Sequence, residues 1–556
     1  MKSAAVLLLA ALLSPSTLAL QVPSTETPST PSVSAPTKPN FFIFVVDDFG
    51  WANIGIHRTP GDDPLHEVVT PAMDALAAEG VNLDRNYLFW YCSPSRSSLQ
   101  TGRNSIHVNV NNDDMSLYNP NEPTTGGYQG IPRNMTGIGS KLSDAGYATH
   151  FYGKWHIGLA TTDHSPKGRG WQNHMIYFDG GNDYWTSECG GCVDGNKHSM
   201  NITDLWKDDA PARGLNNSWD CGQGNQMATC EYEDTFFLNA TLDAIKNHDN
   251  STPFFEIWAP HNIHAPLSVP TAYLNKFSFI NDTRRQAYAA KVNFIDDALA
   301  LVVDALKTSG MWDNTLFILT SDNGGPIYDN GYAGANNWPL RGGKTSNWEG
   351  GVRGVGIVSG GLLPLSRRGV VETGFVSIED WYATLCALAG IDKTDTRAAA
   401  AGLPPVDSLN LWPMLSGMNS TSPRTEIILG MPFISGDNSF GDPYLGVQAL
   451  IREDGHKLII GTTHQNVWTG PQYPNASTKW QNTGNDCTSG CLFNVFTDAT
   501  EHNDVASTYP DIVTSMRARI SELNATMYRP DRGTPSKLAC TAALEKWGGF
   551  WGPFLE

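Results

Sequence analysis

The sequence is poor in basic charge and in long apolar segments. Lys and Arg number 37 against 56 Asp and Glu, which gives a formal net charge of −19. A protein that binds duplex nucleic acid presents a basic face, so this balance argues against a nucleic-acid partner. It does not exclude a small anionic ligand, because a few buried basic groups can dominate one pocket. After the first twenty residues no stretch is long and apolar enough to cross a bilayer, so no membrane span is expected.

Cysteine is scarce and odd in number, with 9 in 556 residues. In a secreted chain an odd count marks one thiol with a separate fate. If Cys92 is set apart, the others could pair, and two short loops are plausible disulfides: Cys221–Cys230 and Cys487–Cys491. Cys189-Gly-Gly-Cys192 could be half of a zinc site, but no second half with ligand spacing accompanies it.

The first 39 residues are predicted to precede the fold. Residues 1–19 combine a charged start, a short apolar run and an A-x-A-like cleavage site, which predicts a signal peptide. The alternative is a short membrane anchor, for which the apolar run is short. Residues 20–39 are rich in Pro, Ser and Thr, as in a flexible linker. The mature protein is therefore expected in the secretory pathway, secreted or lysosomal.

Apolar runs alternate with helical patterns from residue 40 onward. Phe41–Val46 is a continuous apolar run, typical of a strand buried on both faces. Further strands are expected at 148–152, 254–258 and 315–320, and helices opening at Thr70-Pro71, ending at Gly146 and spanning 284–307. This alternation predicts an α/β fold with a large, mostly parallel (mixed) sheet flanked by helices.

The pattern of predicted elements changes near residue 424. Four short strand-like segments follow, at 426–429, 446–452, 457–460 and 492–496, and then a helical stretch at 511–527. We therefore expect a main domain over residues 40–424 and a smaller C-terminal α+β domain over residues 425–556.

Acidic residues directly follow two of the predicted strands. Asp47-Asp48 comes after the first strand, and Asp322-Asn323 comes after the strand at 315–320. Ligands gather at the carboxyl ends of strands in such sheets, and buried adjacent carboxylates need a cation or a metal. Three carboxylates and one amide oxygen suit a hard cation such as Ca²⁺ or Mg²⁺. The alternative is a pair of surface turns, but the joint placement favours a metal site.

A cysteine motif carries the most specific signal. A cysteine phosphatase would need Cys-x5-Arg, and the residue at that position after Cys92 is Ser98. The full string Tyr91–Arg103 resembles instead the signature of the type I sulfatases, in which Cys-x-Pro-x-Arg directs oxidation of the cysteine to formylglycine. Gly146–Gly158 resembles the second signature of that family. Three more strings are similar to its arylsulfatase B branch: Ile263–Leu267, Ala335–Lys344 and Trp348–Gly354.

The resemblance implies an alkaline-phosphatase-like fold and a set of roles. The residues that match the family's calcium site are Asp47, Asp48, Asp322 and Asn323, with Cys92 as the formylglycine facing the ion. The residues that match its basic shell are Arg96, Lys154, His156, His264 and Lys344. The implied enzyme hydrolyses sulfate esters of an aryl alcohol or a sulfated carbohydrate such as N-acetylgalactosamine 4-sulfate. It binds one Ca²⁺ per chain and depends on a formylglycine-generating enzyme for maturation.

Individual roles follow from the chemistry of an aldehyde hydrate, which carries two hydroxyls. One hydroxyl attacks sulfur, and His156 is the candidate that deprotonates the other. His264 or Lys344 would protonate or stabilise the leaving oxygen; His261 lies close enough in sequence to compete, and the motif favours His264. Two alternatives stay open, a metal-dependent phosphomonoesterase or phosphonate hydrolase of the same superfamily and an inactive glycan-binding homologue. Residues 113–130 do not resemble the arylsulfatase B branch, which leaves the substrate pocket undefined.

Overall fold

The structure is a computed structural model that describes most of the chain after residue 37. The described residues are 38–63, 65–112, 114–122, 126–193, 199–215, 221, 230–327, 333–430, 447–475, 478 and 484–556. The predicted signal peptide and nearly all of the predicted linker lie outside them. In the described ranges, no helix has both the length and the apolar character required to cross a membrane.

The strand β1 (Asn40–Val46) lies at the centre of a ten-stranded mixed sheet. It pairs in parallel with β11 (Phe254–Ala259) on one side and with β12 (Thr315–Ser321) on the other. The remaining strands of this sheet are β2 (Val81–Leu83), β5 (Ala148–Lys154), β6 (Asn173–Tyr177), β9 (Trp206–Lys207), β10 (Ala210–Pro211), β14 (Gly356–Ser359) and β15 (Val370–Glu372). Every residue of β1 is buried, as its unbroken apolar sequence predicts.

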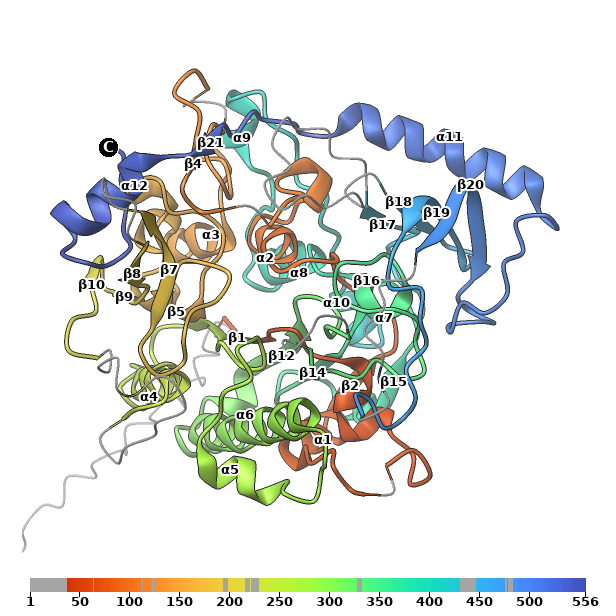
Figure 1. The fold of residues 1–556 in the computed structure, drawn as a ribbon, viewed down its shortest axis with the longest axis horizontal. Helices are drawn as coiled ribbons and strands as arrows, with labels where there is room; N and C mark the ends of the chain where they lie inside the picture. Colours follow the sequence, from red (N-terminus) through yellow and green to blue (C-terminus); the bar gives the residue numbers. More distant parts are fainter. Residues whose placement is uncertain are drawn as a thin grey trace, which may run out of the picture. The chain divides into compact units, whose positions relative to one another are not determined.

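Helices cover both faces of the sheet, and alternate side chains of β1 enter two separate cores. Phe42 and Phe44 pack with α1 (Pro71–Ala78), α4 (Glu233–Lys246) and α6 (Thr283–Thr308). Phe41 and Ile43 pack on the other face with α2 (Cys92–Thr101), α3 (Ile138–Asp144) and α8 (Asp380–Leu388). Figure 1 shows α4, α6 and the short α5 (Thr271–Lys276) on one side of the β1–β12 region, and α2, α3 and α8 on the other. The predicted α/β architecture is confirmed.

A smaller sheet forms in the C-terminal part of the chain. Its four antiparallel strands, with α11 (Pro510–Thr526) packed against them, are β17 (Glu426–Gly430), β18 (Gln448–Arg452), β19 (His456–Thr463) and β20 (Asn485–Asn494). A buried cluster links this sheet to α7 (Glu349–Val352) in the larger region. Small elements complete the chain: β3 (Asn86–Tyr87), β13 (Arg353–Gly354), β16 (Val376–Ser377), β4 (Leu117–Tyr118), β7 (Glu188–Val193), β8 (Ser199–Thr203), α9 (Thr396–Ala400) and α10 (Trp412–Leu415).

The last residues return to the larger sheet region. Beyond α11, β21 (Thr534–Pro535) pairs with β4, and α12 (Lys537–Thr541) carries Cys540. Three disulfides occur among the described residues: Cys192–Cys540, Cys221–Cys230 and Cys487–Cys491. The two short loops predicted from the sequence are therefore confirmed. Cys192 pairs with Cys540 across 348 residues, so the zinc interpretation of Cys189-Gly-Gly-Cys192 is wrong. Cys189 and Cys386 are free thiols, as is Cys92.

Candidate active site

Two parallel strands bring the acidic residues together. In the β1–β12 ladder Val46 stands opposite Ser321, so the residues that follow, Asp47 and Asp322, leave the sheet side by side. The backbone N–H of Asp48 donates to Asp322 Oδ1 over 3.3 Å, and Asn323 Nδ2 donates to Asp48 Oδ1 over 2.8 Å. The exposed fractions of all four residues lie between 0% and 3%. The structure thus gathers the four residues that the sequence predicts as metal ligands.

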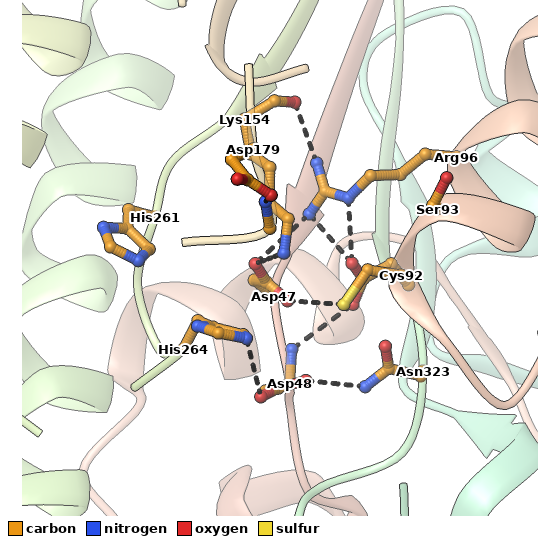
Figure 2. A network of polar contacts seen from close by, with 12 residues as sticks. Asp47, Asp48, Cys92, Ser93, Arg96, Lys154, Asp179, His261, His264 and Asn323 are labelled. Carbon is orange, nitrogen blue, oxygen red and sulfur yellow. Dashed lines mark hydrogen bonds and ion pairs between the residues drawn. The ribbon is translucent and has the colours of Figure 1, made fainter. Parts of the chain in front are cut away.

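The helix α2 carries the cysteine motif to the same place. Cys92 is its first residue and is 1% exposed, with Sγ 3.6 Å from Asp47 Oδ1. Arg96 lies one helical turn later on the same face, which is the spacing that makes the Cys-x-x-x-Arg pattern useful. Its Nε donates to Asp322 Oδ2 over 2.9 Å. Figure 2 shows Cys92 and Arg96, both on α2, directed toward Asp47, which follows β1.

Two lysines complete the contacts with the carboxylates. Lys154, the last residue of β5, places Nζ 2.7 Å from Asp47 Oδ2 and is fully buried. Lys344 places Nζ 2.6 Å from Asp48 Oδ1 and 3.3 Å from Cys92 Sγ. We call the three carboxylates and three cations of this site the catalytic cluster: Asp47, Asp48, Asp322, Arg96, Lys154 and Lys344. Because the charges balance, the cluster needs an additional cation before it can attract an anionic ester.

Two residues of the site adopt left-handed backbone conformations. Asp48 has φ +59° and His156 has φ +51°. A left-handed backbone conformation costs a non-glycine residue about 1–3 kcal/mol and persists only where the surrounding contacts stabilise it. Tyr288, which the sequence analysis did not single out, donates from its hydroxyl to the Asp48 carbonyl oxygen over 2.7 Å. No local pattern marks it, because it lies 240 residues from Asp48 on α6.

The histidines divide into two that face the site and one that is held behind it. His264 Nε2 lies 3.7 Å from Asp48 Oδ2, whereas His261 Nδ1 contacts Glu233 Oε2 at 3.1 Å. Figure 2 shows His264 directed toward Asp48 and His261 set apart from the cluster. His156 is 1% exposed, and its Nδ1 has no hydrogen-bond partner. This geometry favours His264 over His261, in line with the motif.

Burial and charge shift the pKa values of the acidic groups in opposite directions. For Asp47, burial would raise the pKa, but Lys154, His264 and Arg96 together hold it well below its usual range. For Asp322, burial and the neighbouring Asp47 raise the pKa to about 6. For Cys92, burial raises the pKa of the thiol to about 12, although Lys154 and Lys344 oppose the shift. A protonated thiol is a poor nucleophile and a poor metal ligand.

The two candidate acid–base histidines are kept neutral. Burial, followed by the charge of Lys154, lowers the pKa of His264 to about 4. The same two causes hold the pKa of His156 well below its usual value. A neutral imidazole can accept a proton, which suits His156 to the role of a base.

Several side-chain atoms of the site are close enough together to hold a metal ion. Oxygen atoms of Asp47 and Asp48, Cys92 Sγ and a ring nitrogen of His264 all lie within 4.8 Å of one another. The buried Asn323 Oδ1 has no hydrogen-bond partner, which is rare for a buried amide oxygen and is expected where an ion is bound. The sequence assigned His264 to catalysis alone, whereas the geometry also sets it beside the metal ligands. Asp322 directs its second carboxylate oxygen, Oδ2, to Arg96.

Comparisons with known proteins decide the family. The family model described as Sulfatase matches residues 39–391, more than half of the chain. The chain belongs to the sulfatase family. It is accordingly a sulfuric ester hydrolase.

Relatives of this sulfatase cover most of its length. It is 31% identical to arylsulfatase J of Mus musculus over 535 residues, which are 94% of this chain and 81% of the relative. It is 30% identical to N-acetylgalactosamine-6-sulfatase of Homo sapiens over 385 residues, 68% of this chain and 66% of the relative. The solved structure of Ps i-CgsB with k-i-k-neocarrahexaose shares its fold, with a TM-score of 0.66, 23% identity and coverage of 92% and 98%. The predicted sulfatase fold is confirmed, and membership of the arylsulfatase B branch stays a prediction.

Proposed function

We propose that this sulfatase hydrolyses the sulfate ester of a sugar by using formylglycine at position 92 together with a bound Ca²⁺. The observation that carries the proposal is the contact set of Cys92, whose Sγ lies 3.6 Å from a carboxylate and 3.3 Å from an ammonium group. As a thiol it has a pKa raised by burial to about 12, so it would be inert there. An oxidised side chain at position 92 would be reactive, and the carboxylate and the ammonium group would then lie beside its reacting atoms.

Formylglycine would serve as a hydrate. Its hydrate takes the sulfate on one hydroxyl while the alcohol leaves, and proton loss from the other hydroxyl then releases sulfate and restores the aldehyde. A calcium ion held by Asp47, Asp48, Asp322 and Asn323 would supply positive charge where negative charge develops on the sulfate.

The residues of the chain itself have separable tasks in this proposal. Arg96 and Lys154 hold the metal-binding carboxylates through contacts at 2.9 and 2.7 Å. His156, kept neutral by burial and by Lys154, accepts the proton whose loss releases sulfate. Lys344, which lies beside both Asp48 and Cys92, protonates or stabilises the alcohol oxygen of the leaving group. His264 is the alternative beside Asp48, but it would first have to gain a proton, since its pKa is lowered to about 4.

The substrate class is proposed from the relatives. One relative is an N-acetylgalactosamine-6-sulfatase, and one solved structure with this fold holds k-i-k-neocarrahexaose. A sulfated sugar therefore leads over a simple aryl sulfate as the natural substrate. N-acetylgalactosamine 4-sulfate is kept as the first candidate because of the strings similar to the arylsulfatase B branch, not because of these relatives. We also propose that the protein is secreted or lysosomal. Because Cys92 is 1% exposed, a formylglycine-generating enzyme would act before the chain folds.

The test compares ester types under one set of conditions. The wild type should hydrolyse 4-nitrophenyl sulfate faster than 4-nitrophenyl phosphate, and Cys92→Ala should lose both activities. Cys386→Ala, which removes the other fully buried thiol, is the matched control and should retain activity. Preference for the phosphate ester would favour the phosphomonoesterase alternative. Equal rates for wild type and Cys92→Ala would remove the proposal.

A further inference from the structure

A loop from the C-terminal sheet runs along the segment that carries Lys344. We call residues 464–471 the clasp; they follow β19 directly. Gly342 donates its backbone N–H to Val467 O over 2.9 Å, and Arg341 forms an isolated antiparallel bridge with Trp468. Further along, Asn336 Nδ2 donates to Gly470 O over 3.0 Å. The clasp is therefore attached to residues 336–345 at several points.

Side chains at the start of the clasp hold the turn at Lys344. Gln465 Nε2 donates to Lys344 O over 2.5 Å and to Thr345 Oγ1 over 2.6 Å. His464 Nε2 lies 3.0 Å from the same hydroxyl. His464 and Gln465 are 4% and 2% exposed, so these contacts are protected from water. Buried polar contacts of this kind define one geometry, because breaking them leaves groups unsatisfied.

Thr345 is held in a conformation that it would not adopt alone. Its φ is +73°, in the left-handed region that a β-branched residue rarely occupies. Its N–H donates to Trp90 O over 3.0 Å, two residues before Cys92. The turn is therefore fixed on one side by the segment between β3 and α2 and on the other by the clasp.

We propose that Gln465 is a positioning residue that holds Lys344 against position 92, so that the C-terminal sheet completes the active site. The inference rests on the proposed function, in which Lys344 acts on the leaving oxygen. The bonded carbonyl and the ammonium group belong to the same residue, with Nζ 3.3 Å from Cys92 Sγ. A displacement of about 1 Å at a reacting centre can lower a rate by about 10²-fold.

The expected signature is a dependence on the leaving group. A misplaced Lys344 stabilises less of the negative charge on the departing oxygen, and poor leaving groups need that stabilisation most. A variant that only loosens the fold would lower the rates of all substrates by the same factor. The ratio of kcat/KM for phenyl sulfate to that for 4-nitrophenyl sulfate therefore separates positioning from stability.

The test uses the full chain with Gln465→Met, which keeps the length of the side chain and removes its donor. We expect kcat/KM for phenyl sulfate to fall about 10- to 100-fold, with the loss in kcat rather than KM, and that for 4-nitrophenyl sulfate to fall less than about threefold. Gln448→Met on β18 is the matched control and should leave the ratio unchanged.

A second variant keeps the test informative if Gln465→Met folds poorly. His464→Phe retains an aromatic ring and removes the contact with Thr345 Oγ1, so it should lower the ratio in the same direction. An unchanged ratio in folded variants would overturn the inference while the wild type still hydrolyses sulfate esters. A wild type without sulfatase activity would instead remove the proposed function.

Discussion

This protein has two buried clusters of carboxylates and cations, and they differ in how fully their polar atoms are paired. The second, which we call the structural cluster, consists of Lys457, Glu349 and Glu501, all fully buried. Lys457 Nζ lies 2.8 Å from Glu349 Oε1 and 2.9 Å from Glu501 Oε1. The other two carboxylate oxygens accept from Tyr87 OH over 2.9 Å and from the Glu349 N–H over 2.7 Å. All four carboxylate oxygens of the structural cluster therefore have a donor or a cation within 2.9 Å, although the contact between Lys457 and Glu501 is an ion pair without hydrogen-bond geometry.

The catalytic cluster lies beside an unpartnered polar atom and beside strained backbone. Asn323 Oδ1 beside it has no hydrogen-bond partner, and Asp48 and His156 occupy left-handed conformations. Three carboxylates lie at one point, where burial and mutual repulsion raise the pKa of Asp322 to about 6. The comparison teaches that a saturated buried cluster joins two parts of a fold, whereas an unsaturated and strained one is prepared to bind a ligand.

The largest expected effect comes from the catalytic cluster. Asp322→Asn should lower kcat/KM for 4-nitrophenyl sulfate by at least about 10³-fold, about 4 kcal/mol, because it removes a proposed metal ligand. The free energy of unfolding should fall by less than about 4 kcal/mol, because the buried Arg96 loses the charge of Asp322 but keeps that of Asp47 at 3.6 Å. Steady-state kinetics and denaturant unfolding of the same preparation measure both. A variant that is active but unstable would reverse the assignment of this cluster.

The structural cluster should show the opposite pattern. Lys457→Met leaves two buried carboxylates without their cation, so the free energy of unfolding should fall by about 3 kcal/mol. The kcat/KM of the folded enzyme should stay within about threefold of the wild type, because no member of this cluster touches the site. Adding Glu501→Gln should recover part of the lost stability. If Lys457→Met lost activity while its free energy of unfolding stayed unchanged, the contrast between the two clusters would be wrong.

Calcium binding should distinguish the clusters by a smaller effect. At a concentration of about 100 times its Kd, Ca²⁺ should stabilise the wild type by about 2.7 kcal/mol, because it binds only the folded state. Lys457→Met should respond as the wild type does, whereas Asp48→Asn should respond much less. Thermal unfolding with a chelator and with added Ca²⁺ makes the measurement. Equal responses of wild type and Asp48→Asn would place the ion elsewhere.

The smallest effect per step of a measurement, at most about 1.4 kcal/mol for each pH unit, concerns the buried carboxylate of Asp204. Asp204 accepts from the backbone N–H groups of Phe178 and Asp179, both over 2.8 Å, and burial raises its pKa to about 7. A folded pKa above the unfolded value gives stability that is full below about pH 4 and is lost as pH rises through 7, by up to about 1.4 kcal/mol per pH unit. Asp204→Asn should flatten this slope. Identical slopes in unfolding experiments from pH 4 to 8 would contradict the shift.

The parts of the fold that could be predicted are those determined by residues that are consecutive in the sequence. The apolar run Phe41–Val46 became β1 because its continuous burial is visible in consecutive residues, and Pro71 became the first residue of α1, a position that suits proline. Thr70 precedes α1 without a capping hydrogen bond from its side chain. The expected helix at 284–307 became α6. The site residues could be named because each lies inside a motif, and Asp47, Cys92, Lys154 and Asp322 also lie at or next to the end of a strand or helix. Their convergence follows from the parallel register of β1 and β12.

The rest depended on contacts between distant parts of the chain. The Cys192–Cys540 disulfide joins β7 to α12, and spacing cannot reveal such a pair. The contacts of Gln465 with Lys344 and Thr345 span about 120 residues, and the left-handed backbone of Thr345 has no local signal in a β-branched residue. Tyr288 is likewise an ordinary helical tyrosine until the fold brings it to Asp48. Tertiary packing, rather than propensity, selects these residues.

The most direct test of the account is the mass of the tryptic peptide Asn86–Arg96 from the active enzyme. The account predicts a peptide lighter than the cysteine form by about 18 Da, in a proportion that follows the specific activity of each preparation. A fully active preparation whose peptide carries only unmodified Cys92 would contradict the claim that an oxidised side chain at this position performs the reaction.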